Sequence, residues 1–104
     1  MTTLIVLFNL REGVSPETYE RWAAETDLPT VRTLRHCRSF DVFRGLNLLG
    51  TDQPTPFQYV EVIEIDDLPA FREEASTETM RRVASEFRTF ADRPQFMVME
   101  RLDA

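Results

Sequence analysis

Three ionisable side chains of the sequence could move protons: Glu61, Asp27 and His36. Glu61 lies in the apolar stretch "FQYVEVIEI", where loss of hydration would raise its pKa toward the range useful for general acid–base work. Asp27 follows "WAAET" directly before "LP", at the expected end of a helix. His36 is the only histidine, and imidazole ordinarily titrates near neutral pH. We therefore predict Glu61, Asp27 and His36 as the catalytic residues.

Each of these residues also has a structural interpretation. Glu61 could form an ion pair with Arg38 or Arg44 at the sheet or at an interface. Asp27 could cap the short helical turn that begins after it, because aspartate is among the best N-cap residues. His36, in "RHCR", could simply occupy an exposed strand end. The sequence leaves both interpretations open for all three.

Three further side chains are candidates for substrate binding: Trp22, Tyr59 and Asn9. Trp22 and Tyr59 could form a flat wall against an aromatic ring, where stacking contributes about 0.5–1.5 kcal/mol per pair. Asn9, near the end of the first apolar run, could anchor a hydrogen bond. Alternatively, Trp22 and Tyr59 could belong to the hydrophobic core, and Asn9 could be an ordinary turn residue.

The sequence lacks the usual signatures of other chemistries. One histidine beside one cysteine, Cys37, offers no ligand spacing for a metal. No glycine-rich phosphate loop and no nucleophile elbow occur. We therefore predict neither metal nor cofactor, and expect any chemistry to depend on proton transfer and positioning.

Composition limits the class of protein. The 104 residues, 42% hydrophobic and 29% charged, fit one globular domain spanning 1–104. A net charge of −6 argues against nucleic acid and membrane surfaces as partners. A single cysteine and the lack of a recognisable leader pattern lead us to expect a cytoplasmic protein.

Hydrophobic periodicity predicts four strands and two helical regions. Ser15 and Pro16 are typical of a helix start, whereas Pro29 is expected to break or kink that helix at Leu28, with "TVRTL" continuing as a further turn or two. Ser76 is expected to cap a later helix. The predicted strands cover 4–10, 37–44, 57–65 and 95–100. The first helical region covers 16–28, the second consists of a short helix over 68–75 and a longer one over 76–91, and a long loop covers 45–56.

This order of elements predicts an α+β, ferredoxin-like βαββαβ fold with both helical regions on one face of a four-stranded antiparallel sheet. Taking polar residues as the guide, we assign two sets to the helix-covered face: Thr3, Ile5, Leu7 and Asn9, and Tyr59, Glu61, Ile63 and Ile65. The other face then holds Leu4, Val6, Phe8, Val60 and Val62. An apolar surface of that size predicts a homodimer whose sheets pack face to face, a dimeric α/β barrel.

The stretches "YERWAAETDLPTVRTL", "FDVFRG" and "FQYVEVIEI" resemble the REDY-like family, the HapK relatives of prodiginine pathways, over nearly the whole chain. The resemblance implies a dimeric α/β barrel that assists condensation or ring closure of a pyrrole- or indole-type intermediate without a cofactor. The layout is more distantly similar to EthD-like and antibiotic-monooxygenase families. In the EthD-like proteins a histidine stands where this chain has Asp27.

Three functions follow from the residues and the resemblance together. The first is a cofactor-independent enzyme or auxiliary protein of secondary metabolism that promotes condensation or cyclisation by positioning and proton transfer. The second is a cofactor-free monooxygenase acting on an aromatic substrate. The third is a non-catalytic dimeric carrier that shields a reactive intermediate.

Overall fold

The structure is a computed structural model, and it describes residues 1–103. Its elements follow one another along the chain in this order: β1 (Thr2–Leu10), α1 (Pro16–Trp22), η1 (Ala23–Asp27), α2 (Leu28–Val31), β2 (Cys37–Arg44), β3 (Tyr59–Ile65), α3 (Leu68–Glu74), α4 (Glu78–Phe90) and β4 (Ala91–Glu100).

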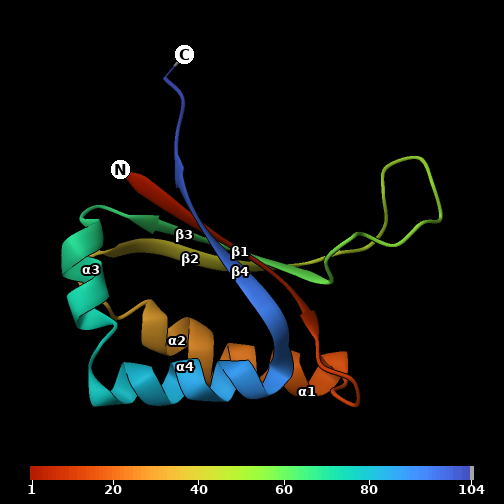
Figure 1. Cartoon of the computed structure of the whole chain (residues 1–104), viewed down its shortest axis with the longest axis horizontal. Helices are drawn as coiled ribbons and strands as arrows, with labels where there is room; N and C mark the ends of the chain where they lie inside the picture. The colour runs from red at the N-terminus through yellow and green to blue at the C-terminus, as the bar shows by residue number, and fades with distance from the viewer. Residues whose placement is uncertain (104) are drawn as a thin grey trace.

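The four strands form one antiparallel sheet in the order β2-β3-β1-β4. Figure 1 shows the sheet as an upper layer with α1, α2 and α4 beneath it and α3 at one end. The lower face of the sheet is therefore covered by helices, and the upper face is bare. This arrangement is the ferredoxin-like α+β fold, which confirms the predicted fold class.

Local chemistry fixes the helix starts. The Ser15 hydroxyl accepts a hydrogen bond from the Thr18 N–H at 3.2 Å, as predicted for the cap of α1. The cap of α4 is Thr77, whose hydroxyl accepts from the Met80 N–H, rather than the predicted Ser76. Ser76 instead donates its hydroxyl to the Glu73 carbonyl and so ends α3.

The first helical region continues past Pro29 into α2, as the predicted further turn requires, and does not break there. Asp27 and Leu28 keep helical dihedrals, and the Leu28 N–H donates to the Ala23 carbonyl, five residues back. A proline inside a regular α-helix has no N–H to donate and its ring collides with the carbonyl four residues earlier. The wider π-turn of η1 relieves that collision, so the helix continues into α2.

The face assignment for β1 was wrong, and that for β3 was right. Tyr59, Glu61, Ile63 and Ile65 are buried, as predicted, and their partners in the register are Phe8, Val6, Leu4 and Thr2. Directly opposed residues share a face, so Val6 and Phe8 face the helices, while Thr3, Ile5, Leu7 and Asn9 face away. The polar residues misled the assignment because they lie at strand ends, where Thr3 donates to Glu64 and Asn9 accepts from the Gln58 N–H.

Strand β4 is longer than predicted, beginning at Ala91 rather than at Gln95. Asn9 and Leu10 pair with Asp92 and Ala91 beyond an irregularity in the register. At that point Arg93 has a positive φ of 47°, which lets the strand carry Pro94 and still continue. The chain therefore turns from α4 directly into β4 (Figure 1).

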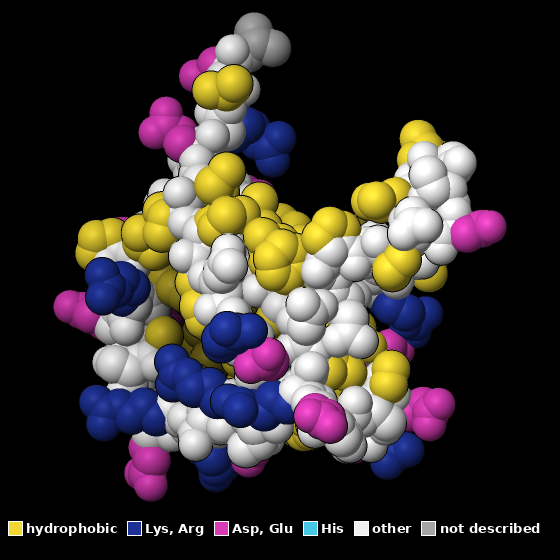
Figure 2. All heavy atoms as spheres, turned by 45° about the vertical axis from the view of Figure 1, so that its right-hand side comes forward, with side chains coloured by type: hydrophobic (Ala, Val, Ile, Leu, Met, Phe, Trp, Pro, Cys, Tyr) yellow, Lys and Arg dark blue, Asp and Glu magenta, His cyan; other side chains and the backbone are white. Residues whose placement is uncertain are grey.

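The upper face of the sheet is apolar and partly open. The register places Ile5 and Leu7 of β1 beside Val62 and Val60 of β3, with Met97 and Met99 of β4 continuing the surface. Figure 2 shows hydrophobic side chains gathered along this upper side, between the C-terminal segment and the 45–56 loop. Val60 and Val62 are thus on the face predicted for them, whereas Leu4, Val6 and Phe8 are not. Among residues 1–103, no helix has the length and apolar character needed to cross a membrane.

Candidate active site

Two acidic side chains are buried between the sheet and the helices. Asp27 is 5% exposed and Glu61 is 4% exposed, and both line the same cavity of about 150 Å³. The remaining lining is mostly apolar, with Phe40 and Ile63 from the sheet and Phe87 from α4. A cavity of this size and character holds one benzene-sized ring, as measured in engineered apolar cavities.

Asp27 owes its inward position to the π-turn. Tyr19, Ala23, Asp27 and Val31 are the buried residues of this helical region, spaced by four residues each time. The structure shows no side-chain capping bond from Asp27, so the predicted capping role is wrong. Within residues 1–103 no hydrogen bond or ion pair reaches its carboxyl group, whose oxygens open onto the cavity rather than being sealed in protein.

Glu61 lies in the middle of β3, opposite Val6 of β1 on one side and Val42 of β2 on the other. Its one hydrogen bond partner is the Tyr19 hydroxyl, which donates to Oε2 across 3.4 Å. The ion pairs predicted as the alternative role do not form, because Arg38 pairs with Asp66 and Arg44 with Glu20. Glu61 is therefore a buried acid without a basic partner in the described part of the chain.

Burial shifts the titration of both acids upward. Loss of hydration raises the pKa of Asp27 to about 7. It raises the pKa of Glu61 to about 8, with a further contribution from repulsion by Asp27 that the Tyr19 hydrogen bond opposes. Two acids that titrate near neutrality in one cavity are able to give and take protons at physiological pH.

The cavity opens between α4 and β4. Of its lining residues, Ala84 and Arg88 of α4 are exposed on one side, and Phe96 of β4 is 51% exposed on the other. Ala84 was predicted to lie on the inner face of its helix with Met80, Val83 and Phe87, but it is exposed and lies at the edge of this opening. A ligand can therefore enter beside Ala84 and Phe96 and reach the acids.

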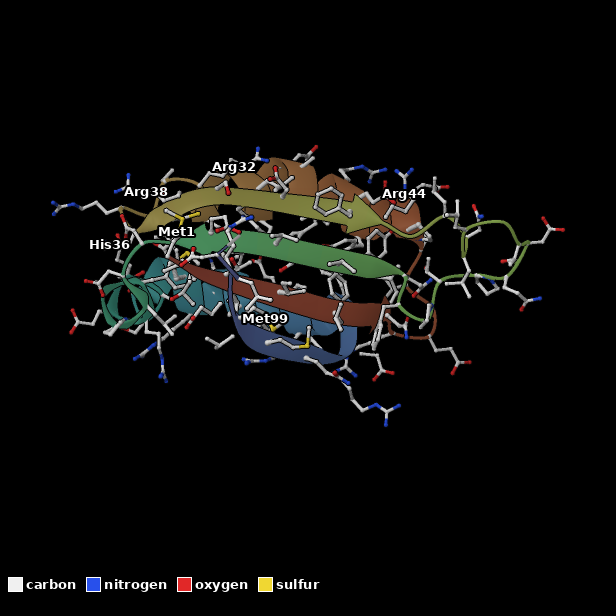
Figure 3. The ribbon with its side chains drawn as sticks, turned by 90° about the horizontal axis from the view of Figure 1, so that it is seen from above. Met1, Arg32, His36, Arg38, Arg44 and Met99 are labelled. Atoms are coloured by element: carbon white, nitrogen blue, oxygen red, sulfur yellow. The ribbon has the colours of Figure 1, made fainter. Side chains whose placement is uncertain are left out.

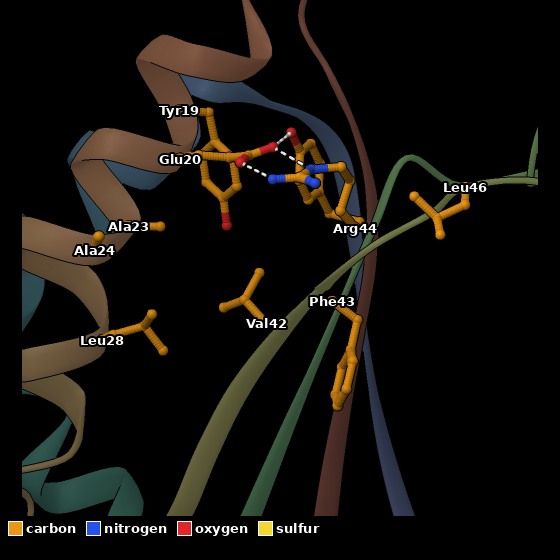
Figure 4. A pocket seen from close by; sticks show the side chains of 10 residues that line it. Tyr19, Glu20, Ala23, Ala24, Leu28, Val42, Phe43, Arg44 and Leu46 are labelled. Atoms are coloured by element: carbon orange, nitrogen blue, oxygen red, sulfur yellow. Dashed lines mark hydrogen bonds and ion pairs between the residues drawn. The ribbon is translucent and has the colours of Figure 1, made fainter.

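A second hollow of about 450 Å³ adjoins the first, between the α1–η1 region and the end of β2. Figure 4 shows its polar corner, where the Arg44 guanidinium pairs with Glu20. The Tyr59 hydroxyl also donates to Glu20 Oε2, at 2.7 Å. These hydrogen bonds hold the pKa of Glu20 well below its usual range.

Tyr19 lies between the two hollows. It lines the larger one, and its hydroxyl points toward Val42 in the close view (Figure 4). The same hydroxyl donates to Glu61, which lines the smaller cavity. Tyr19 is therefore the direct link between the Glu20–Arg44–Tyr59 corner and the acid pair.

His36 is remote from the acids. Its Nδ1 lies 2.8 Å from Asp66 Oδ1, in a cluster that also includes Arg38. Figure 3 shows His36 and Arg38 at one end of β2 and Arg44 at the other. His36 lines neither hollow. The structure therefore brings Asp27 and Glu61 together and leaves the third predicted catalytic residue outside.

The three predicted binding residues also separate. Tyr59 lines the larger hollow and stacks on Phe8 with ring centroids 5.5 Å apart. Trp22 lines neither hollow; it packs against Phe90 of α4 and donates its indole N–H to Glu86 at 2.8 Å. Asn9 faces the bare side of the sheet. Of the three, Tyr59 alone is in a position to touch a ligand in either hollow.

Tyr19, Glu20 and Arg44 were not predicted as site residues, and Arg44 was considered only as an ion-pair partner of Glu61. The signal for the Glu20–Arg44–Tyr59 corner was available, since Arg44 and Tyr59 are direct partners in the register of two recognisable strands. Among residues 1–103, no three His, Cys, Asp or Glu side chains are grouped as a metal site would require.

A family model described as "REDY-like protein HapK" matches residues 2–102. The structure is similar to the crystal structure of HapK from Hahella chejuensis, with 28% identity and a TM-score of 0.79 over 100% of this chain and 95% of that one. None of the curated proteins compared with the chain matches it.

Two less similar structures share the fold. One is a dimeric ferredoxin-like protein of unknown function from Thermobifida fusca, at 14% identity and a TM-score of 0.73, covering 94% of this chain and 88% of that one. The other is SnoaB, a cofactor-independent oxygenase from Streptomyces nogalater, at 16% identity and a TM-score of 0.74, covering 99% and 94%. The family match fits an enzyme or auxiliary protein of secondary metabolism.

Proposed function

The chain belongs to the REDY-like HapK family, and from that premise we propose that it is a cofactor-independent enzyme that promotes condensation or cyclisation of a pyrrole- or indole-type intermediate. The observation that carries the proposal is the buried pair Asp27 and Glu61, which has no basic partner within residues 1–103 and opens onto an apolar cavity sized for one ring.

The pair is suited to hold one proton at neutral pH. With pKa values of about 7 and 8, one carboxyl is protonated and the other ionised over much of the physiological range. Such a pair titrates as a unit, so the proton belongs to both groups. One member can then act as the general acid while the other acts as the general base.

A condensation at this site uses both roles. An electron-rich ring carbon attacks a carbonyl carbon, and the protonated carboxyl donates its proton to the carbonyl oxygen. The ionised carboxylate accepts the proton that leaves the ring carbon, so the pair again holds one proton. Loss of water then needs one further proton delivered to the hydroxyl and one removed from the ring N–H, which returns the pair to its starting state.

Positioning supplies the rest of the rate enhancement. The apolar walls around Ile63 and Phe87 exclude water and hold a planar ring against the acids. Fixing a reactant and a catalytic group in one geometry can lower a barrier by several kcal/mol. Tyr19, through its bond to Glu61, fixes the orientation of that carboxyl group.

We also propose that the protein is a cytoplasmic homodimer. The open apolar surface around Ile5, Val60 and Val62 favours a second copy packed against the bare face of the sheet. The structural neighbour from Thermobifida fusca is itself described as dimeric. A single cysteine, Cys37, is in keeping with a reducing compartment. Sedimentation equilibrium at micromolar concentration tests the dimer.

The test of the activity is condensation of pyrrole-2-carbaldehyde with 2,4-dimethylpyrrole, followed by the visible absorbance of the dipyrrin product. We expect the protein to accelerate the reaction and the variants Asp27→Asn and Glu61→Gln to lower kcat/KM by a hundredfold or more. Glu25→Gln, on the exposed side of the same helical region, is the matched control and should leave the rate unchanged.

Other outcomes would assign a different function. Equal rates for the wild type and both amide variants, with ligand binding retained, would make the protein a carrier. Consumption of oxygen by the purified protein in the presence of a reduced aromatic substrate would make it an oxygenase.

A further inference from the structure

The opening of the acid-lined cavity carries positive charge. We propose that the ligand of this cavity is an aromatic or heteroaromatic carboxylate, with its ring inside and its carboxylate held at the opening by Arg88 and Arg81. This inference rests on the proposed function, because it takes the acid-lined cavity as the substrate site and specifies the substrate class.

Helix geometry places two arginines around the opening. Arg81, Ala84 and Arg88 are spaced by three and four residues, so they form one stripe on α4. Ala84 and Arg88 line the cavity and both are exposed. Arg81 lies one turn from Ala84 on the other side, a rise of about 4.5 Å. A group emerging beside Ala84 therefore meets a guanidinium in either direction along the helix.

The positive charge at the opening has no acid to neutralise it in the described residues. Neither Arg81 nor Arg88 has a carboxylate within ion-pair distance among residues 1–103. Glu86, the one acid between them in sequence, accepts the Trp22 indole N–H instead. A third guanidinium lies close by, because Arg11 Nε donates to the Arg88 carbonyl at 2.8 Å.

This basic edge stands out in an acidic protein. The chain carries a net charge of −6, yet basic side chains gather low on the molecule, over the helical layer, in Figure 2. Arginine presents parallel N–H groups that match the two oxygens of a carboxylate. The edge is therefore a suitable place to hold an anionic group at the surface.

The charges also fix the orientation of the ligand. A carboxylate placed inside the cavity would face Asp27 and Glu61 at low dielectric, where repulsion is strong. The same carboxylate at the opening faces guanidinium groups instead. The ring consequently enters first, beside the half-exposed Phe96, and its N–H or reacting carbon meets the acid pair.

The test compares indole-3-carboxylate with its methyl ester, a neutral probe of nearly the same shape, by calorimetric titration at pH 7. We expect the carboxylate to bind at least tenfold more tightly than the ester, since charge-assisted hydrogen bonds contribute more than one factor of ten. Arg88→Met should lower carboxylate affinity about tenfold, and Arg81→Met severalfold, with ester affinity unchanged in both.

Arg82→Met is the matched control. Arg82 is exposed on the same helix but lies one residue off the stripe, so this variant should bind both probes as the wild type does. If the ester binds as tightly as the carboxylate, the inference is wrong while the proposed function stands. If neither probe binds the wild type, both fail. If Arg82→Met and Arg88→Met lowered carboxylate affinity equally, the inference would also be wrong, because positive charge would then favour binding whether or not it lies at the cavity opening.

Discussion

The molecule contains two tyrosine–glutamate pairs, Tyr59–Glu20 and Tyr19–Glu61, and the pKa values of their glutamates are shifted in opposite directions. Tyr59 donates to Glu20 at 2.7 Å, and Tyr19 donates to Glu61 at 3.4 Å. Glu20 also pairs with Arg44 near the surface, and its pKa is lowered. Glu61 is buried without a cation, and its pKa is raised to about 8. A tyrosine hydroxyl by itself therefore does not decide the charge of a carboxyl group; the neighbouring cation and the degree of hydration do.

The two pairs are also interleaved. Tyr19 and Glu20 are consecutive on α1, whereas Tyr59 and Glu61 alternate on one face of β3. Each element thus supplies the tyrosine of one pair and the carboxylate of the other. This arrangement places the ion-paired Glu20–Arg44–Tyr59 corner in one hollow and Glu61, with its partner acid Asp27, in the adjacent one.

The largest expected effect is on stability as a function of pH. In the unfolded chain Asp27 and Glu61 ionise near pH 4, whereas in the folded protein they ionise near 7 and 8. Between about pH 4 and pH 7 to 8 the folded state therefore binds protons that the unfolded chain has released. The stabilisation that results is complete below about pH 4 and is lost as pH rises through 7 and 8. Denaturant unfolding between pH 5 and 9 should therefore show a decrease, on the order of several kcal/mol.

The double variant Asp27→Asn/Glu61→Gln should flatten this decrease, and Glu20→Gln should leave it in place. Glu20 has the opposite sign, because its lowered pKa contributes stability that is present at neutral pH and is lost as pH falls below about 4. A decrease that persists in the double variant would show that other groups cause it.

The next effect concerns activity. The acid pair must hold one proton, so kcat/KM should be greatest between about pH 7 and 8 and should fall on both sides. Glu61→Gln should lower the maximum by a hundredfold or more, while Glu20→Gln should change it by less than about fivefold and leave the profile in place. Equal losses of kcat/KM in the two variants would show that Glu20 and Glu61 do not differ in their contribution to activity.

A smaller effect is expected when the cation is removed. Arg44→Met should raise the pKa of Glu20 toward its ordinary value of about 4.3, because the largest cause of its lowering is the Arg44 hydrogen bond. The pKa of Glu61 should not change. Carbon-13 NMR of the labelled carboxyl groups measures both, and a shift at Glu61 would mean that the two hollows are electrostatically coupled.

The smallest effect sharpens the role of the tyrosines. Tyr19→Phe should raise the pKa of Glu61 slightly and Tyr59→Phe should raise that of Glu20, since each hydroxyl stabilises the ionised acid. The second change should be the larger, because the Tyr59 bond is shorter by several tenths of an ångström. The same NMR titration ranks the two, and the reverse order would contradict the geometry.

Much of the fold follows from the sequence because local patterns and tertiary packing agree. The bounds of β2 were predicted to the residue, and Ser15 and Pro16 begin α1 as their chemistry requires. The face of β1 that meets the helices could not be assigned with the same success. The side chains on both faces of this strand are mostly apolar, and the polar residues Thr3 and Asn9 lie at its ends. Where both faces of a strand are hydrophobic, alternation carries little information.

The candidate site was predicted in part. Glu61 was identified because a carboxyl group inside an apolar strand is conspicuous, and Asp27 because it follows a helical pattern. Their meeting was not predictable, since it depends on a π-turn that the sequence pattern does not display. His36 was selected on its intrinsic pKa alone, and it lies instead directly before β2, at the strand end that its structural interpretation gave it.

The wide turn from Ala23 to Asp27 has a consequence for how this activity can be gained or lost. One residue advances a helix by about 100°, so removing Glu25 would restore a regular spiral and rotate the following carboxyl group away from the ring-sized chamber. Such a deletion should abolish the proposed activity while leaving both Asp27 and Glu61 in the chain. One residue of length in this turn therefore decides whether the two carboxyl groups meet, although neither of them is replaced.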